Sequence, residues 1–309
     1  MKKLAWVIGE GGMLGSHLVN VLPAQGFEVF SPHLKFNWDD KNQVIFQIKN
    51  VFDVFSREII GYKEWMIFWA AGNSNMLTKD SDVAKENEIF DSLIQCLEEQ
   101  KHISMKGIFA VASSAGAIYA DSQLSIVSEN SPVCPNTSYA LGKLQQEKLI
   151  INLSTQNPLI SAAIFRISTL YGIRANNFNS QGLINAMARK ILNHQDIEFF
   201  VPLNTFRDFI HVEDASLLIA KILNEAFENP KTFIKIVSSG ETHSIDEIIE
   251  IFRKKIKHPF SYKCKLNEFS NIYNKRVNFQ STLPGGVEYS RIRGLEEGIG
   301  DLLMQLNYP

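Results

Sequence analysis

Short apolar runs alternate with longer amphipathic segments along the first half of this 309-residue chain. The runs have the length of buried strands: LAWVI (4–8), EVF (28–30), WMIFWAA (65–71), IFAVAS (108–113) and ISAAIFRI (160–167). Helical patterns lie between several of them, at 13–22, 82–99 and 139–153. Strands of this kind separated by helices indicate a parallel sheet covered on both faces. The sequence therefore predicts an α/β fold with a doubly wound parallel sheet.

The alternation loosens after Arg166, where an asparagine-rich loop follows. Further on, the pattern predicts a strand at FIKIVSS (233–239) and a helix that begins near Ser244. We expect a main domain at 1–165, with returns of the chain to it near 207–240. A smaller α/β lobe, mostly carboxy-terminal, is expected at 166–206 and 241–309.

Charge and cysteine content exclude several classes of protein. The 31 basic and 33 acidic residues nearly balance, so we expect neither nucleic acid nor an anionic membrane as a partner. The three cysteines have no CxxC spacing, which argues against disulfides and a metal site and for a reducing, cytoplasmic location. The amino-terminal apolar run covers only Leu4–Ile8, and no segment reaches the ~18 to 20 apolar residues of a membrane span.

The first predicted strand runs directly into GEGGMLGSHLV, in which glycines recur every third residue. Glycine permits a tight turn there and lets the backbone approach a pyrophosphate, while the next helix offers free amides to the phosphates. With a strand before it and a helix after it, this turn predicts a dinucleotide site. Its expected cofactor-binding residues are Gly9, Gly12, Met13, Leu14 and Gly15.

Several further motifs follow this turn in a fixed order. They are WAAGN (69–73), KEN with Asn87, SSAGAIYA (113–120), SYALGK (138–143), FRISTLYG (165–172) and RDFIHVED (207–214). Together they make the chain resemble the short-chain dehydrogenase/reductase superfamily, in its extended branch, the NAD-dependent epimerase/dehydratase family that acts on nucleotide sugars. The resemblance covers nearly the whole chain and implies a Rossmann fold. It adds Ala70, Ala71, Gly72 and Asn87 to the expected cofactor-binding residues.

Tyr139 and Lys143 are spaced four residues apart, which places them on one face of a helix. A phenol ionises near pH 10 in water, and a neighbouring ammonium favours its anion. The resemblance implies that Tyr139 exchanges a proton with a sugar hydroxyl while Lys143 also contacts the nicotinamide ribose. Both are expected to be catalytic.

The family usually has a serine or threonine four residues before the tyrosine that stands in this chain as Tyr119 of SSAGAIYA, and this chain has Ala115 at that position. Ser114 is the nearest hydroxyl and is expected to be catalytic and to bind substrate, with Ser113 the next candidate. A shift of one residue at a strand end turns a side chain to the other face. This departure keeps open a second hypothesis, a regulatory dinucleotide-binding protein with weakened turnover.

The cofactor is expected to be NAD or NADP. NAD-selective sites of this kind usually place an acidic residue at the end of the second strand. This chain offers Ser31, Pro32 and His33 there, with Lys35 beyond. No carboxylate in that position repels a 2′-phosphate. The acidic pair at 39–40 lies further along and is a candidate for contact with the adenine.

The expected substrate is a nucleotide-linked sugar. Arg207 matches a family arginine that holds the diphosphate, and the alternative for it is a surface ion pair with Asp208 or Glu213. Asn176 and Asn177 lie in the long loop and are expected to bind substrate. The histidines at 211 and 243 have no spacing for a metal and are interpreted as structural.

The resemblance implies one of three reactions on a nucleotide-linked sugar: 4-epimerisation, 4,6-dehydration or reduction of a 4-keto group. A dehydratase of this family has an acid and base pair after the catalytic hydroxyl, where this chain has Gly116 and Ala117, so dehydration is disfavoured. A 4-epimerase and a 4-ketoreductase both remain open. The resemblance also implies a possible homodimer, formed through the helices predicted at 82–99 and 139–153.

Overall fold

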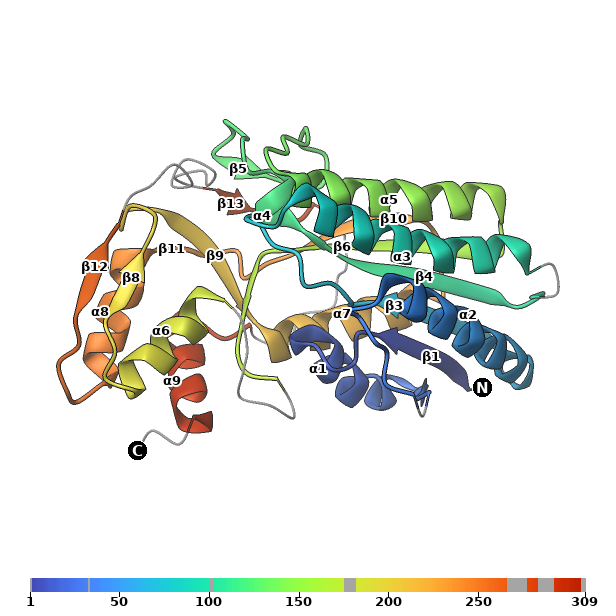
Figure 1. The fold of residues 1–309 in the computed structure, drawn as a ribbon, viewed down its shortest axis with the longest axis horizontal. Coiled ribbons are helices and arrows are strands. Elements are labelled where there is room, and N and C mark those ends of the chain that lie inside the picture. The colour runs from blue at the N-terminus through green and yellow to red at the C-terminus, as the bar shows by residue number, and fades with distance from the viewer. Residues whose placement is uncertain are drawn as a thin grey trace. The chain divides into compact units, whose positions relative to one another are not determined.

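The computed structural model describes residues 2–32, 34–100, 103–174, 182–265, 277–282 and 292–306. Its main sheet has six strands in the order β10-β6-β4-β3-β1-β2 (Figure 1). Their bounds are β1 Lys3–Ile8, β2 Phe27–Phe30, β3 Glu64–Trp69, β4 Lys106–Ser114, β6 Ile160–Ile167 and β10 Phe233–Val237. The predicted α/β class with a doubly wound parallel sheet is confirmed.

The central strands are buried on both faces, as the continuous apolar runs predict. Every residue of β3 is buried, and β1 is buried from Leu4 to Ile8. The pairing is parallel and in register, with Ala5 opposite Val29 on β2 and opposite Met66 on β3. β3 pairs with β4 in the same direction.

Helices connect successive parallel strands of this sheet. They are α1 Met13–Val21, α2 Lys41–Glu58, α3 Asp80–Glu99 and α5 Ser138–Gln156, with short 3-10 turns η1 Pro23–Gln25 and η2 Ile59–Gly61. The chain moves one way along the sheet from β1 to β2 and the other way from β2 onward, so α1 covers one face and α2, α3 and α5 cover the other (Figure 1). On that face α3 packs between α2 and α5.

Aromatic side chains fill the space between the sheet and α2. Trp6 packs against Phe30 and Phe55, and Phe55 also meets the edge of Trp65. These rings are buried, and the Trp6–Phe30 and Phe55–Trp65 pairs meet edge to face, a favourable arrangement for aromatic rings. The core therefore holds the carboxyl ends of the strands in a fixed arrangement, which is where a doubly wound sheet places its site.

The chain forms two compact units. The first comprises Met1–Ser113, Thr137–Phe165 and Ala220–Ile234, and the second comprises Ser114–Asn136, Arg166–Ile219 and Lys235–Pro309. Helix α7, Val212–Ala226, runs from the second unit into the first.

The second unit has small sheets of its own. One joins β7 Thr169–Tyr171, β9 Phe206–His211 and β11 Thr242–Ser244; the others pair β8 Ile197–Phe199 with β12 Tyr262–Cys264, and β5 Ile126–Val127 with β13 Asn278–Phe279. Its helices are α4 Ala115–Ile118, α6 Leu183–Leu192, α8 Ile245–Lys255 and α9 Leu295–Gln305. Ser244 and Glu247 form a capping box at the start of α8, so the helix predicted near Ser244 is confirmed. Across the described ranges, we find no helix with the length and hydropathy of a membrane span.

Candidate functional site

The glycine turn after β1 is too tight for side chains at two positions. Gly9 has φ +95°, and a Cβ there would lie 2.6 Å from the Ala71 amide nitrogen. A Cβ on Gly15 would lie 2.1 Å from the Gly9 carbonyl oxygen. Glycine is therefore required at both positions, and the segment after β3 passes directly beside the turn.

The turn leads into a helix terminus that is open to an anion. The Gly12 amide donates to the Gly9 carbonyl (2.8 Å), and α1 begins at the next residue. In the described structure its N-cap makes no side-chain hydrogen bond, and its first turn carries no acidic residue. The amides at Met13 and Leu14 thus belong to the unsatisfied donors of a helix start. Close backbone approach and uncapped amides fit the pyrophosphate of a dinucleotide.

The segment at Ala70, Ala71 and Gly72 continues from β3 toward α3. The Ala70 amide donates to the Ile8 carbonyl (2.8 Å), and Gly72 has φ +141°. Beyond it, Glu86 of α3 accepts the backbone amides of Asn73 (2.6 Å) and Ser74 (2.9 Å) through one carboxylate oxygen. This carboxylate fixes the loop that lies next to the glycine turn.

Tyr139 and Lys143 lie one turn apart at the start of α5. Thr137 caps the helix, because its hydroxyl accepts the Ala140 amide (3.2 Å). The Lys143 Nζ lies 5.9 Å from the centroid of the Tyr139 ring. The structure therefore brings the phenol and the ammonium to the same face of the helix.

Lys143 is buried, with 8% of its surface exposed. Its Nζ donates to the Ala112 carbonyl and to Gln146 Oε1, each across 3.2 Å. An ammonium has three donors, so one of them has no partner among the described residues. Burial lowers the pKa of Lys143, while the carboxylates of Glu86 and Glu147 oppose that shift.

Asn87 is buried against α5, and its amide is engaged there. Its Nδ2 donates to Gln145 Oε1 and its Oδ1 accepts from Gln146 Nε2, both across 2.9 Å. Because Gln146 also binds Lys143, Asn87 connects to the lysine through one intermediate side chain. The described contacts of Asn87 are thus to the helix that carries Tyr139.

The two serines at the end of β4 have different partners. Ser113 is buried, and its hydroxyl donates to Glu147 Oε1 (2.6 Å). Ser114 is partly exposed and caps α4, accepting the Ala117 amide (3.3 Å). Ala115 is completely buried. Of these three positions, only Ser114 presents a hydroxyl that is partly exposed.

Arg207 lies on β9 in the second unit, where its guanidinium donates to the Phe206 carbonyl (2.7 Å). Its neighbour Asp208 is buried and accepts the amides of Ser239 and Gly240 (2.9 and 2.8 Å). Burial raises the pKa of Asp208, and these hydrogen bonds oppose the rise. A small depression beside the arginine is lined by Gly116, Thr169, Phe206, Arg207, Asp208, Val277 and Phe279.

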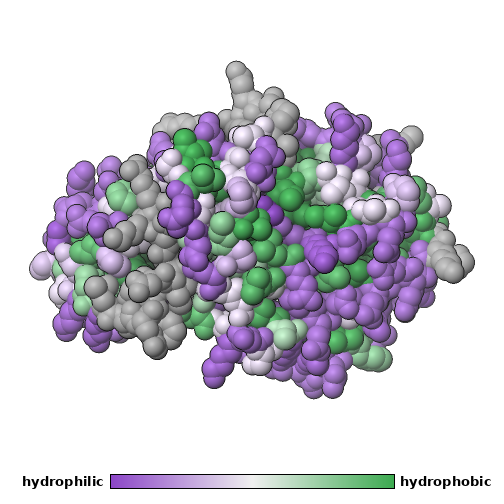
Figure 2. All heavy atoms as spheres, turned by 90° about the horizontal axis from the view of Figure 1, so that it is seen from above, coloured by the Kyte–Doolittle hydropathy of each residue, from purple (hydrophilic) through white to green (hydrophobic). Residues whose placement is uncertain are grey.

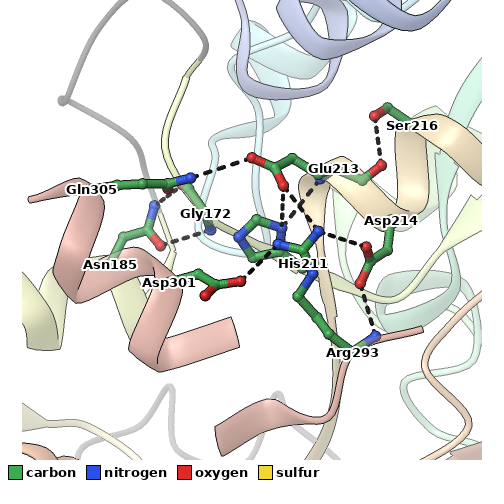
Figure 3. A network of polar contacts seen from close by, with 9 residues as sticks. All are labelled: Gly172, Asn185, His211, Glu213, Asp214, Ser216, Arg293, Asp301 and Gln305. Carbon is green, nitrogen blue, oxygen red and sulfur yellow. Dashed lines mark hydrogen bonds and ion pairs between the residues drawn. The ribbon is translucent and has the colours of Figure 1, made fainter. Parts of the chain in front are cut away.

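A network of charged side chains joins the start of α7 to α9 (Figure 3). Arg293 lies 2.9 Å from Glu213, 3.0 Å from Asp214 and 3.1 Å from Asp301. Burial raises the pKa of Asp214, and Arg293 opposes the rise. His211 is buried beside this network, and its Nδ1 accepts the Glu213 amide (3.4 Å). Glu213, one alternative partner for Arg207, is thus paired with Arg293.

Some of the residues predicted from the sequence lie outside the described ranges or have structural contacts. Asn176, Asn177 and His33 lie outside the described residues. The Asp40 carboxylate caps α2 by accepting the Gln43 amide (3.0 Å). In the described ranges no group of three or more histidine, cysteine or acidic side chains is arranged to hold a metal ion.

Sequence reasoning missed Glu86, Gln146, Glu147 and Arg293. Glu147 continues the spacing of Tyr139 and Lys143 by one more helical turn, and this signal was available in the sequence. Glu86 had no such signal, because its contacts depend on how α3 packs against the loop after β3.

The chain is similar to known proteins in sequence and in fold. The model of the NAD dependent epimerase/dehydratase family matches residues 5–234. A Methanocaldococcus jannaschii protein named "Putative UDP-glucose 4-epimerase" is 27% identical over 83% of this chain and 82% of its own length. The Escherichia coli dTDP-4-dehydro-6-deoxyglucose reductase is 28% identical over 47% of this chain and 44% of its own length. The Thermotoga maritima UDP-glucose 4-epimerase, solved with UDP-glucose, superposes with a TM-score of 0.77 over 99% of both chains at 15% identity, a likeness of fold.

Proposed function

Because the chain belongs to the NAD dependent epimerase/dehydratase family, we propose that it interconverts nucleotide-linked sugars at C4 by hydride transfer, with Tyr139 as acid and base. The cofactor is NAD or NADP. We assign its binding to the domain at 1–165, with the returns near 207–240, and substrate binding to the lobe at 166–206 and 241–309. A 4-epimerase is the first form of the proposal and a 4-ketoreductase is the second.

The observation that carries the proposal is the placement of Tyr139 and Lys143. The ammonium lies beside the phenol ring, is buried, and has one donor that no described residue uses. A positive charge held in a site of low polarity stabilises a phenolate more strongly than one in water. Tyr139 is thereby suited to remove a proton from a sugar hydroxyl and to return it.

The dinucleotide is assigned to the glycine turn and the start of α1. Gly9 and Gly15 leave room for close approach, and the amides at 13 and 14 donate to phosphate oxygens. When bound, the nicotinamide supplies the hydride acceptor and donor. Ala70, Ala71 and Gly72 flank the turn and are assigned to the cofactor. Asn87 is assigned to it as well and connects to Lys143 through Gln146.

Ser114 is assigned the hydrogen bond to the reacting sugar oxygen. Ser113 already donates its hydroxyl to Glu147, whereas the Ser114 hydroxyl accepts from an amide and keeps its own hydrogen for a further partner. Arg207, Asn176 and Asn177 are assigned to the diphosphate and sugar. A guanidinium binds phosphate oxygens in pairs, and Asp208 beside it is engaged with backbone amides.

The similar proteins support both forms of the proposal. The relative that spans most of this chain carries an epimerase name, and the shorter match is a reductase. Ser31 and Pro32 follow β2, and neither carries a carboxylate that would repel the 2′-phosphate of NADP. This end of the strand therefore suits NADP as well as NAD. Gly116 and Ala117, in place of an acid and base pair, disfavour dehydration.

We also propose a homodimer through the outer faces of α3 and α5. These helices pack together in the first unit, and Leu141 on α5 is 59% exposed. The side of the molecule that carries them has apolar patches among its hydrophilic side chains (Figure 2). An exposed leucine on a helix pair suits an interface better than it suits water.

The test is binding followed by turnover. The melting temperature of the purified protein is measured with NAD, NADP and their reduced forms, and then with UDP, GDP and dTDP sugars. Retention of NAD through purification together with interconversion of C4 epimers supports the epimerase, and consumption of exchangeable NADPH with a 4-keto sugar supports the reductase. A melting temperature that no dinucleotide raises would contradict the proposal.

A further inference from the structure

Three ionisable side chains follow one another on a single face of α5. Tyr139, Lys143 and Glu147 are spaced by four residues, so each lies one turn beyond the last. The lysine and the glutamate are both buried, with 8% and 3% of their surfaces exposed. A buried ion destabilises the fold unless an opposite charge lies near it. The group that balances the charge of Lys143 therefore affects both the stability of the protein and the protonation of the lysine.

Glu147 is held in place by β4. Its Oε1 accepts the hydroxyl hydrogen of Ser113 across 2.6 Å, and that serine is itself buried. The Lys143 ammonium donates to the carbonyl of Ala112, the residue immediately before this serine. Glu147 and Lys143 are therefore anchored to consecutive residues of the same strand.

The other groups that face Lys143 come from α3 and α5. From α3, Glu86 contributes a negative charge, but its carboxylate is partly exposed and binds the amides of Asn73 and Ser74. From α5, Gln146 contributes a neutral oxygen. The described residues of β4 at this point contribute a carbonyl and a hydroxyl, and no ionisable group.

We infer that Glu147 is the buried counter-ion that keeps Lys143 protonated and, through it, positions and activates Tyr139. Glu147 contacts neither substrate nor cofactor in this account, so it is a positioning residue. The part that concerns Tyr139 rests on the proposed function, whereas the electrostatic effect of Glu147 on Lys143 does not depend on it. Burial lowers the pKa of Lys143, and the carboxylates of Glu86 and Glu147 both oppose that shift.

The first experiment is a double-mutant cycle on the cofactor-free protein, read as melting temperature. Glu147→Gln keeps an oxygen that accepts from Ser113 and removes only the charge. We expect Glu147→Gln to lower the melting temperature when Lys143 is present. In a Lys143→Met background, where the glutamate has lost its counter-ion, we expect the same substitution to leave the melting temperature unchanged or to raise it. An equal loss in both backgrounds would show that the charge of Glu147 acts independently of Lys143 and would overturn the inference.

The second experiment needs no Lys143 variant and follows melting temperature against pH. Lys143 has a folded-state pKa below its unfolded value, and Glu147→Gln lowers the folded value further. The melting temperature of the variant is therefore lower than that of the wild type near pH 7, and the difference disappears as pH rises toward the ordinary lysine pKa of about 10.4. A deficit that is constant across this range would overturn the inference.

The third readout is the rate profile of the active enzyme. Glu147→Gln is expected to move the alkaline loss of kcat to lower pH by roughly one unit. Glu88→Gln is the matched control, because Glu88 on α3 is exposed and pairs with Lys41. An unchanged alkaline limb in Glu147→Gln would refute the positioning role. A protein without turnover would contradict the proposed function, and the two unfolding experiments would still decide whether the charge of Glu147 stabilises the protonated Lys143.

Discussion

Gly15 lies against Gly9 so closely that a methyl group on it would be 2.1 Å from the Gly9 carbonyl oxygen. Real side chains do not occupy such a position, so the backbone of the turn would have to move. The contact ties the first turn of α1 to the end of β1 and sets the direction in which the helix amides point. The dinucleotide assignment depends on this direction.

Gly15→Ala is accordingly expected to destabilise the protein by about 3 kcal/mol and to abolish the melting-temperature increase caused by dinucleotides. Gly11→Ala is the control for folding, because a Cβ at Gly11 meets nothing within 4 Å. Thermal unfolding with and without NAD or NADP measures both effects. A Gly15→Ala protein that keeps dinucleotide stabilisation would remove the turn from the cofactor site.

The two serines at the end of β4 are predicted to differ in what they support. Ser114→Ala should lower kcat by about 100-fold and cost about 1 kcal/mol for the lost helix cap. Ser113→Ala should cost about 1 to 3 kcal/mol, because the buried Glu147 carboxylate loses a donor. Steady-state kinetics and urea unfolding of both variants separate these effects. Normal kcat in Ser114→Ala would withdraw its catalytic assignment.

Arg293 is predicted to stabilise the second unit. Arg293→Ala leaves Glu213, Asp214 and Asp301 without their shared cation, and we expect a loss of about 2 kcal/mol at pH 7. Arg253→Ala breaks an exposed pair with Glu250 and should change the stability much less.

The loss caused by Arg293→Ala should also depend on pH. Burial already raises the pKa of Asp214, and removal of the arginine raises the folded-state value further. At acid pH, Asp214 of the variant then takes up a proton on folding. The stability lost in the variant therefore becomes smaller as pH falls through the carboxyl range near 4 to 5. Melting temperatures of variant and wild type between pH 4 and pH 7 give the comparison. A deficit that grows on acidification would contradict the pairing.

The dimer proposal predicts that Leu141→Glu yields a monomer, since it places a charge in the outer face of α5. Phe46→Glu on α2 changes a residue that is 65% exposed outside the proposed interface and should leave the assembly intact. Light scattering after size-exclusion chromatography measures the masses. A wild-type monomer, or a Leu141→Glu dimer, would exclude this interface.

The sequence was sufficient for the main sheet and for the phenol and ammonium pair. The strands at 4–8 and 28–30 were predicted within a residue of β1 and β2. The first is a continuous apolar run that ends at a glycine, and the second is a short segment that follows Gly26 and precedes Ser31 and Pro32. The pairs β8 with β12 and β5 with β13 could not be predicted, since strands of two or three residues have no measurable periodicity. Glu86 was missed for a related reason, since its partners are backbone amides from another element.

The central claim is that Tyr139 performs the acid and base chemistry beside a dinucleotide held by the first turn of the sheet. Tyr139→Phe tests it most directly, with turnover of a nucleotide sugar and dinucleotide affinity measured on the same preparation. We expect kcat to fall by at least about 1,000-fold while the dissociation constant of NAD or NADP changes little. A Tyr139→Phe protein that turns over substrate at the wild-type rate would contradict the account.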